Sequence, residues 1–169
     1  MNDQVKTFIR VDHAGEYGAA RIYAGQLAVL GRGKYGPQLE HMKAQEQVHL
    51  DAFAGMIVQR RVRPSALLPF WHVAGFALGA VTAALGPEAA MACTVAVEEV
   101  IDEHYSAQRE ALGEEEAALS TTVEQFRLEE REHRDIGLAN GAEQAPGYRL
   151  LTGLIRAGCK AAIRLSEAV

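Results

Sequence analysis

Apolar and polar residues recur along most of the chain with the spacing of an α-helix, and no useful stretch alternates with the period of two of a β-strand. Proline and glycine clusters divide this pattern into segments. Pro37 stands where a helix would begin, and Gly86-Pro87 opens another. The pattern predicts helices over residues 2–30, 37–59, 87–112, 115–138 and 148–166, together with an apolar segment over residues 66–92. It therefore predicts an all-α protein.

The apolar segment over residues 66–92 has only two ionisable side chains, His72 and Glu88. Its first 21 residues are enough to cross a bilayer core of about 30 Å as a helix. Pro69 and several glycines interrupt it, and arginines cluster just upstream at residues 60–63. Three interpretations stay open: a buried crossover helix of the domain, a helix embedded in one face of a membrane, or a full membrane span.

The last predicted helix, over residues 148–166, combines an apolar face with basic residues at Arg149, Arg156, Lys160 and Arg164. A basic stripe beside an apolar face is typical of amphipathic helices that lie on anionic membranes. The alternative is a solvated face on a helix that packs against the core.

Composition narrows the class of protein. With 169 residues, 49% of them hydrophobic, the chain is long enough for one folded domain over residues 1–169. The balance of 17 Lys and Arg against 22 Asp and Glu disfavours nucleic-acid binding. Cys93 and Cys159 have no metal-binding or disulfide spacing, which indicates free thiols. The N-terminus has no secretory signal pattern.

A Glu-x-x-His motif occurs twice, at residues 46–49 and 130–133. Residues three apart share a helix face, so each motif directs a carboxylate and an imidazole to one point. The preceding helix of each half carries a further glutamate, Glu16 or Glu98, about 30 residues upstream of its motif. Two antiparallel hairpins of matching length would bring both halves to one level of a four-helix bundle. The repeat comprises Glu16, Glu46, His49, Glu98, Glu130 and His133.

This set of residues is typical of a dinuclear metal site. Four carboxylates and two imidazoles in a four-helix core hold two divalent metals about 3.5–4 Å apart. Oxygen-rich ligation favours iron or manganese over zinc, and two ferrous ions can activate O₂ for hydroxylation. Glu99 is an alternative to Glu98, but the face of Glu98 carries Ile101 and Tyr105, so we expect Glu98 to point inward. The alternative is that these are solvated helical carboxylates beside histidines at the edge of the core.

Neighbouring residues are candidates for supporting roles. Tyr23 and Tyr105 each follow the upstream glutamate of their half by seven residues. Gln45 and Glu129 precede the motif glutamates, and we expect each to contact the histidine of the opposite half. His104, beside Tyr105, is a candidate for the wall of a substrate path.

Two aspartates are weaker candidates for the same supporting role. Asp12 and Asp102 lie one turn from the upstream glutamates. The remaining histidines, at positions 13, 41 and 72, have no partner at ligand spacing and are interpreted as surface or core residues.

Several stretches resemble the demethoxyubiquinone hydroxylase family over essentially the whole chain: RVDHAGEYGAARIYAGQ (10–26), EQVHL (46–50), RVRP (61–64), FALGA (76–80), AMACTVAVEE (90–99), EREHRDIGL (130–138) and AGCKAAIRLSE (157–167). The resemblance implies a ferritin-like di-iron monooxygenase. Such an enzyme uses O₂ to hydroxylate a demethoxyubiquinol (2-polyprenyl-3-methyl-6-methoxy-1,4-benzoquinol) in ubiquinone biosynthesis. The family's metal ligands fall on the six residues of the repeat.

The resemblance also implies partners and a location. Family members are peripheral membrane proteins whose apolar helices receive the polyprenyl tail, and NADH is the suggested ultimate reductant, although no binding motif for it is present. Eukaryotic members work with a lipid-binding accessory protein. We expect the cytoplasmic side of a bacterial inner membrane, or the mitochondrial matrix side for a trimmed eukaryotic form. A homo-oligomer stays open. His104 and Tyr105 are the catalytic candidates, as gates for protons or electrons.

Two other classes of function compete with the oxygenase. A ferritin-like iron-storage or peroxide-scavenging protein would use the same six ligands without an organic substrate. A non-catalytic helical protein of the membrane surface would carry the Glu-x-x-His motifs by chance.

Overall fold

The computed structural model describes residues 2–169, which contain six α-helices, two short 3₁₀ helices and no strand. The α-helices are α1 (Asp3–Leu30), α2 (Gly36–Gln59), α3 (Leu68–Ala84), α4 (Pro87–Ala111), α5 (Ala117–Ala139) and α6 (Tyr148–Ala168); the 3₁₀ helices are η1 (Glu114–Glu116) and η2 (Ala142–Gln144). The predicted all-α fold is confirmed. The five predicted helices begin and end within about two residues of the observed bounds.

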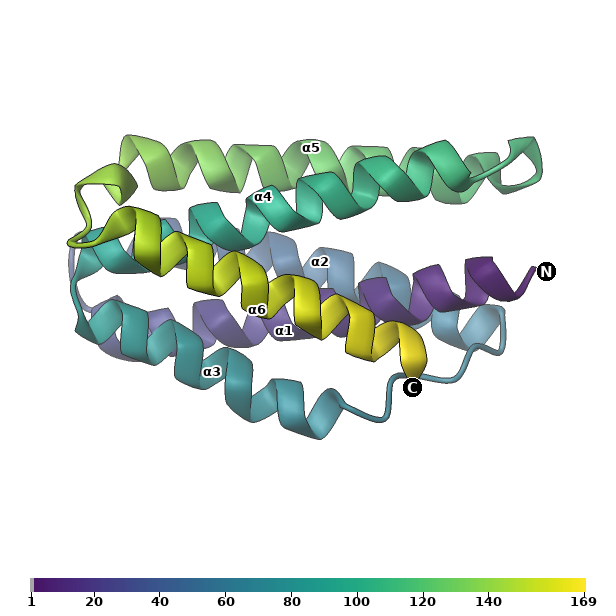
Figure 1. The fold of residues 1–169 in the computed structure, drawn as a ribbon, viewed down its shortest axis with the longest axis horizontal. Helices are drawn as coiled ribbons and strands as arrows, with labels where there is room; N and C mark the ends of the chain where they lie inside the picture. The colour runs from purple at the N-terminus through teal and green to yellow at the C-terminus, as the bar shows by residue number, and fades with distance from the viewer. Residues whose placement is uncertain (1) are drawn as a thin grey trace.

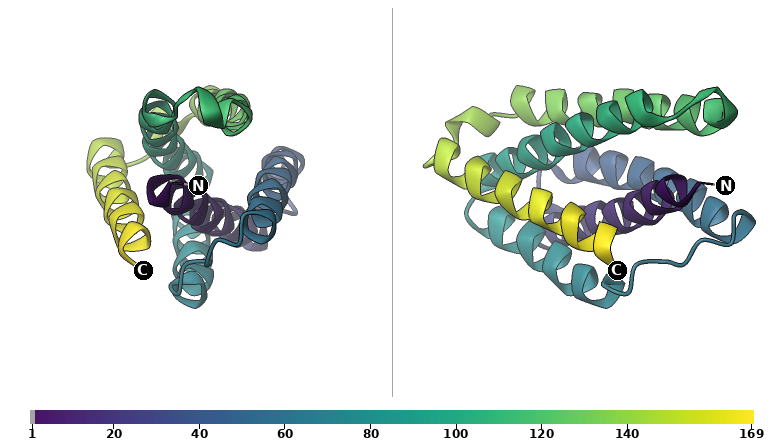
Figure 2. Two further views of the ribbon diagram at one scale, coloured as in Figure 1. Left: turned by 90° about the vertical axis from the view of Figure 1, so that its right-hand side faces the viewer. Right: turned by 45° about the vertical axis from the view of Figure 1, so that its right-hand side comes forward.

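Helices α1, α2, α4 and α5 form a four-helix bundle made of two antiparallel hairpins (Figure 1). Within each hairpin the helices pack closely, α1 on α2 and α4 on α5, whereas α1 and α4 touch at few points. Helices α3 and α6 lie outside this bundle, α3 along α1 and α6 along α4, as the end-on view shows (Figure 2). The arrangement is the predicted ferritin-like bundle with two added helices.

The apolar segment over residues 66–92 is divided between two helices. Helix α3 ends at Ala84, and Gly86 makes the turn into α4 with a φ of 129°, a backbone conformation that favours glycine. The segment therefore does not form the single long helix that the full-span interpretation needs. Within residues 2–169, no helix combines the length and the apolarity that crossing a membrane requires.

Helix α3 packs on α1 through glycines that let the two backbones approach. A Cβ atom at Gly75 would lie 2.8 Å from the carbonyl oxygen of Gly18, and one at Gly79 would clash with the carbonyl of Ile22. These contacts support the interpretation as a crossover helix. The helix nevertheless exposes large apolar side chains at Phe70, Val73 and Val81, and Leu85 follows at its end.

The bundle core has a polar layer between two apolar layers. Along α2, Met42 belongs to one apolar cluster, Glu46 and His49 follow, and Phe53 belongs to the other cluster. The other three bundle helices repeat this order, with a buried glutamate in the middle. The fold thus places the residues of the sequence repeat at one level inside the bundle.

Candidate metal centre

The six residues of the repeat converge at the centre of the bundle, and none is more than 3% exposed. They form two overlapping groups whose ligand atoms lie within 4.8 Å of one another: Glu16, Glu46, His49 and Glu130, and Glu46, Glu98, Glu130 and His133. Glu46 and Glu130 belong to both groups. Shared carboxylates of this kind bridge the two ions in dinuclear sites.

Both histidines turn Nδ1 toward the cluster and Nε2 away from it. His49 Nδ1 lies 2.9 Å from Glu130 Oε1, and its Nε2 lies 2.6 Å from Glu129 Oε2. His133 Nδ1 lies 3.0 Å from Glu130 Oε2, and its Nε2 lies 2.9 Å from Gln45 Oε1. Each outer contact joins α2 to α5, which confirms the expectation for Gln45 and Glu129. Because these oxygens accept, Nε2 donates, and the neutral ring then presents Nδ1 to a metal.

The two tyrosines cross between the halves of the repeat. Tyr23 on α1 donates a 2.9 Å hydrogen bond to Glu98 Oε1 on α4, and Tyr105 on α4 donates to Glu16 Oε1 on α1. Each tyrosine thus donates a hydrogen bond to the glutamate of the opposite hairpin. Both are about 1% exposed, so their hydroxyls belong to the buried cluster.

Several carboxylate oxygens of the cluster are buried and unsatisfied. Within residues 2–169, both oxygens of Glu46 and the Oε2 atoms of Glu16 and Glu98 accept no hydrogen bond, although His133 Nδ1 lies 3.1 Å from Glu46 Oε1 and His49 Nδ1 lies 3.4 Å from Glu16 Oε2. Burial, reinforced by neighbouring carboxylates, raises the pKa of Glu46 and Glu98 well above its ordinary value, and burial also raises that of Glu16. Unpaired buried carboxylates are costly. Two divalent cations would balance the four carboxylates, so these residues fit a dinuclear centre.

The imidazoles and carboxylates of this cluster also hold protons. Burial opposes ionisation of Glu130, but hydrogen bonds from His133 and His49 lower its pKa to about 2. Burial likewise opposes a charge on His49, but its hydrogen bond to Glu130 and the nearby carboxylate of Glu16 raise its pKa to about 12. The pKa of His133 is raised in the same way, by Glu130. Metal binding at these atoms must therefore displace protons.

A second polar cluster lies beside Tyr105. Asp12 is buried, with its Oδ1 2.7 Å from Gln108 Nε2 and 3.2 Å from His104 Nε2, and burial raises its pKa. Asp102 instead lies 2.7 Å from Arg127, outside this cluster. Sequence reasoning missed Gln108, although its spacing of four from His104 places both on one helix face.

The charged residues between α4 and α6 form pairs. Glu98 points inward, as expected, while Glu99 lies 2.5 Å from Arg156 and Glu103 lies 2.7 Å from Lys160. Two members of the basic stripe on α6 therefore face α4.

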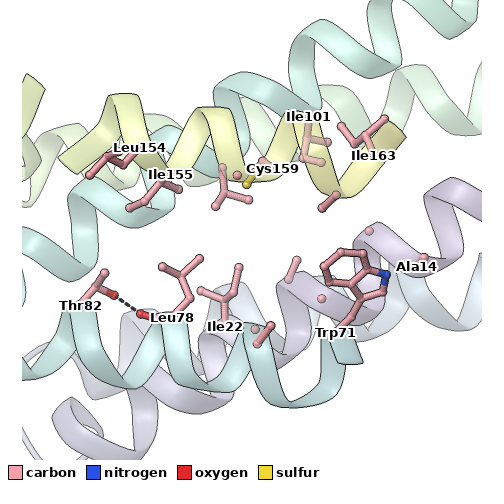
Figure 3. A pocket seen from close by; sticks show the side chains of 18 of the residues that line it. Ala14, Ile22, Trp71, Leu78, Thr82, Ile101, Leu154, Ile155, Cys159 and Ile163 are labelled. Carbon is pink, nitrogen blue, oxygen red and sulfur yellow. Dashed lines mark hydrogen bonds between the residues drawn. The ribbon is translucent and has the colours of Figure 1, made fainter. Parts of the chain in front are cut away.

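An apolar cavity of about 470 Å³ lies between α1, α3, α4 and α6 (Figure 3). Ala14, Gly15 and Gly18 line it from α1, and Val97 and Ile101 line it from α4. The cluster lies on the other side of these two helices, next to the cavity wall. The residues of α3 and α6 that line the cavity include Trp71, Leu78, Leu154, Ile155, Cys159 and Ile163.

The positions of His104, Tyr105 and the two cysteines relate to the cavity and the core as follows. Neither His104 nor Tyr105 is among the residues that line the cavity. His104 Nε2 lies 3.2 Å from Oδ1 of the buried Asp12 on α1. Cys93 and Cys159 are free thiols, as predicted, and burial raises the pKa of each to about 12.

The fold and the cluster define a ferritin-like all-α protein with a candidate dinuclear centre. The sequence model of the family described as ubiquinone biosynthesis protein COQ7 matches residues 3–166. The chain therefore belongs to this family of demethoxyubiquinone hydroxylases, which confirms the resemblance seen in its motifs.

Relatives from bacteria and eukaryotes match nearly the whole of this chain. The 3-demethoxyubiquinol 3-hydroxylase of Rhodospirillum rubrum is 58% identical over 166 residues, covering 98% of this chain and 78% of the relative. The NADPH-dependent 3-demethoxyubiquinone 3-hydroxylase, mitochondrial, of Rattus norvegicus is 59% identical over 167 residues (96% and 77%). The 5-demethoxyubiquinone hydroxylase, mitochondrial, of Saccharomyces cerevisiae is 42% identical over 179 residues (95% and 76%). The family consists of hydroxylases, so the chain is an enzyme of this type.

Proposed function

We propose that this chain hydroxylates the ring of a demethoxyubiquinol that carries a polyprenyl tail, with O₂ as co-substrate and two iron ions as cofactor. The names of its relatives describe this substrate class. The observation that carries the proposal is the position of the buried carboxylate–imidazole cluster directly behind the wall of an apolar cavity. A metal site that reacts with a lipid-tailed ring needs both features side by side.

The proposed iron ligands are Glu16, Glu46, His49, Glu98, Glu130 and His133. Their oxygen-rich donor set suits iron. When bound, two ferrous ions supply the electrons and the open coordination positions that O₂ reduction requires. Glu129 and Gln45 hold the two imidazoles in the orientation that ligation needs, because they accept the Nε2 protons.

Tyr105 and His104 are proposed to position the cluster and to hold protons. The Tyr105 hydroxyl holds its proton on Glu16, and burial with the nearby carboxylates raises the pKa of Tyr105, which keeps it neutral. His104 Nε2 lies between Asp12 and Gln108, and its side chain is 14% exposed. This cluster is the proposed route by which protons reach the neighbourhood of Glu16.

The cavity is the proposed site for the substrate ring and the first part of its tail. Leu85, Leu150 and Leu154 are more than half exposed at the edges of α3 and α6, next to the cavity lining. We propose that this apolar rim rests on a membrane surface, where a tail leaving the cavity stays out of water. A bacterial inner membrane on its cytoplasmic side, or the mitochondrial inner membrane on its matrix side, is the proposed location.

The proposed source of electrons is a reduced nicotinamide. The sequence resemblance suggests NADH, whereas the name of the rat relative specifies NADPH. A lipid-binding accessory protein and a homo-oligomer stay predictions from the family resemblance.

A ferritin-like storage or scavenging protein is the alternative function. It uses the same cluster, but the apolar cavity next to the cluster has no role in it. Incubation of the iron-loaded chain with a demethoxyubiquinol, a reductant and isotopically labelled O₂ separates the two. The proposal predicts one labelled oxygen atom in the ring and none with Glu130→Gln. Iron oxidation without ring hydroxylation would favour the alternative.

A further inference from the structure

Helices α1 and α4 separate the apolar cavity from the buried cluster, and the line along which they face each other is here called the seam. Two buried hydrogen bonds cross the seam, from Tyr23 to Glu98 and from Tyr105 to Glu16. The two helices run antiparallel (Figure 1), so these bonds lie at different levels along the seam. Because α1 and α4 touch at few points, side chains fill the seam between the two bonds.

Ala19 and Ile101 lie between these two bonds. Ala19 is three residues after Glu16, and Ile101 is three residues after Glu98, so each lies beside the glutamate of its own helix. The antiparallel register brings Ala19 and Ile101 to the same level, close to midway between the two bonds. Both residues line the cavity. At its centre the seam therefore holds one small and one large apolar side chain.

Ile101 contacts both sides of the seam. On the bundle side it packs against the apolar cluster that includes Phe53 and Tyr105. On the cavity side it packs against the apolar cluster that includes Val97 and Ile155. Figure 3 shows Ile101 among the side chains that line the cavity. Its side chain thus connects the cavity lining with the interior of the bundle.

Buried polar contacts join α1 to α4 on both sides of this apolar pair. Toward one end of the seam, Asp12 accepts a 2.7 Å hydrogen bond from Gln108. Toward the other end, Gln26 donates a 3.1 Å hydrogen bond to the carbonyl of Ala90. An apolar ring that entered the seam at either place would break buried hydrogen bonds, which is unfavourable. Between these contacts, the apolar pair offers the ring a path that leaves the hydrogen bonds in place.

We propose that the substrate ring approaches the cluster between Ala19 and Ile101, and that the combined size of these two side chains sets how far the ring enters. This inference rests on the proposed function and adds the point of approach to it. The ring edge lies against Ile101, at the level midway between Glu16 and Glu98, and the tail stays in the cavity. Ile101 is therefore a specificity-determining residue, because a flat ring fits beside one large side chain but not beside two.

A swap of side-chain volume across the seam tests this point of approach. Ala19→Ile fills the seam, and the double variant Ala19→Ile with Ile101→Ala restores its total volume. Leu78→Phe is the control, because it adds volume to the cavity lining on α3, away from the seam. The probe is the decyl analogue of the demethoxy quinone. Its binding is measured by quenching of the fluorescence of Trp71, the single tryptophan of the chain, which lines the cavity.

The position of the bound ring is measured with the full-length chain loaded with Mn²⁺, which suits an oxygen-rich donor set. Paramagnetic enhancement of proton relaxation falls steeply with the distance from the metal. The quinone has one ring proton, on the carbon that the proposed reaction hydroxylates, and a terminal methyl group on its tail. The relaxation of both is compared per bound ligand, with the metal-free chain as reference.

In the wild type, the ring proton should show the larger enhancement. Ala19→Ile should lower the enhancement of the ring proton to the level of the terminal methyl group, although the quinone still quenches Trp71. The double variant should recover the difference, and Leu78→Phe should keep it. Ala19→Val adds less volume and should give a smaller loss, which keeps the test available if Ala19→Ile does not fold.

Three results would overturn the point of approach and leave the cavity as the binding site. They are quenching without ring enhancement in the wild type, a ring enhancement that both variants of Ala19 retain, and an equal loss in Leu78→Phe. Absence of recovery in a folded double variant would likewise overturn the pairing of Ala19 with Ile101. If the quinone neither quenches Trp71 nor relaxes in the wild type, the proposed function itself fails.

Discussion

The Tyr23 hydroxyl donates a 2.9 Å hydrogen bond to Glu98 across the bundle, from α1 to α4. Tyr23 is not placed to bind a metal itself; it supports a carboxylate that is. Replacing Tyr23 by Phe should therefore lower the free energy of unfolding by about 1–2 kcal/mol while the iron content stays the same. Urea unfolding and metal analysis measure the two effects. Loss of iron in Tyr23→Phe would contradict this division of roles.

Glu129 orients the imidazole of His49 through a 2.6 Å contact at Nε2. Removing it with Glu129→Ala should weaken iron binding about 10- to 100-fold, as expected for a group that supports a metal ligand. Glu132→Ala is the matched control, because Glu132 is an exposed glutamate on the same helix. Competition with a ferrous chelator measures the affinities. Equal affinities in the two variants would refute a role for Glu129.

The metal-free chain should lose stability as the pH rises. Burial raises the pKa of Glu46 and Glu98 above the ordinary value of 4.5, and carboxylate partners raise that of His49 from 6.5 to about 12. A group whose pKa is raised on folding binds its proton more tightly in the folded chain than in the unfolded chain. The stability that this proton contributes is therefore lost as the pH rises above the ordinary pKa of the group. The melting temperature without metal should fall between about pH 5 and pH 9.

Iron loading should flatten this dependence, because cations replace the protons. Glu130 has the opposite effect on the pH dependence. Its pKa of about 2 lies below the ordinary value of 4.5, so its charged form adds stability that is lost only as the pH falls below 4.5. Glu46→Gln should also flatten the metal-free curve. Melting curves across this pH range, with and without chelator, are the measurement. A metal-free melting temperature that rises over the same range would show that the cluster does not control it.

Gly18 leaves room in the cavity, since a Cβ atom there meets nothing within 4 Å. Gly55 on α2 is equally open but does not line the cavity. Both Gly→Leu changes favour the helix by about 0.8 kcal/mol, so neither should prevent folding. Gly18→Leu should weaken binding of a long-tailed quinol about tenfold or more, because overfilling a packed site costs about 1–3 kcal/mol. The Gly55→Leu variant should bind the quinol with the affinity of the wild type. Weaker binding by Gly55→Leu than by Gly18→Leu would place the tail outside the cavity.

The sequence was sufficient for the elements and for the six clustered residues. Helix ends follow from local signals such as Pro37 and Gly86-Pro87. The cluster follows from the repeated Glu-x-x-His spacing, because residues three apart share a face in any helix. The opposite-half contacts of Gln45 and Glu129 could be predicted because the repeat fixes both hairpins at one level.

The sequence alone does not predict contacts that depend on how two helices pack against each other. The cavity depends on α3 running parallel to α1, which glycine contacts between the backbones decide. The pairing of Arg156 with Glu99 depends on where α6 lies, so the basic stripe alone could not show it. The reach of Tyr105 to Glu16 depends on the spacing of α1 and α4 across the core.

The iron content of the purified chain decides whether the six clustered residues hold two metal ions. After anaerobic loading with ferrous ions and removal of the excess, the dinuclear centre predicts about two irons per chain. It also predicts that Glu46→Ala, which removes a carboxylate common to both ligand groups, retains none. A wild-type chain that binds no iron, or a Glu46→Ala chain that binds as much as the wild type, would contradict the dinuclear centre.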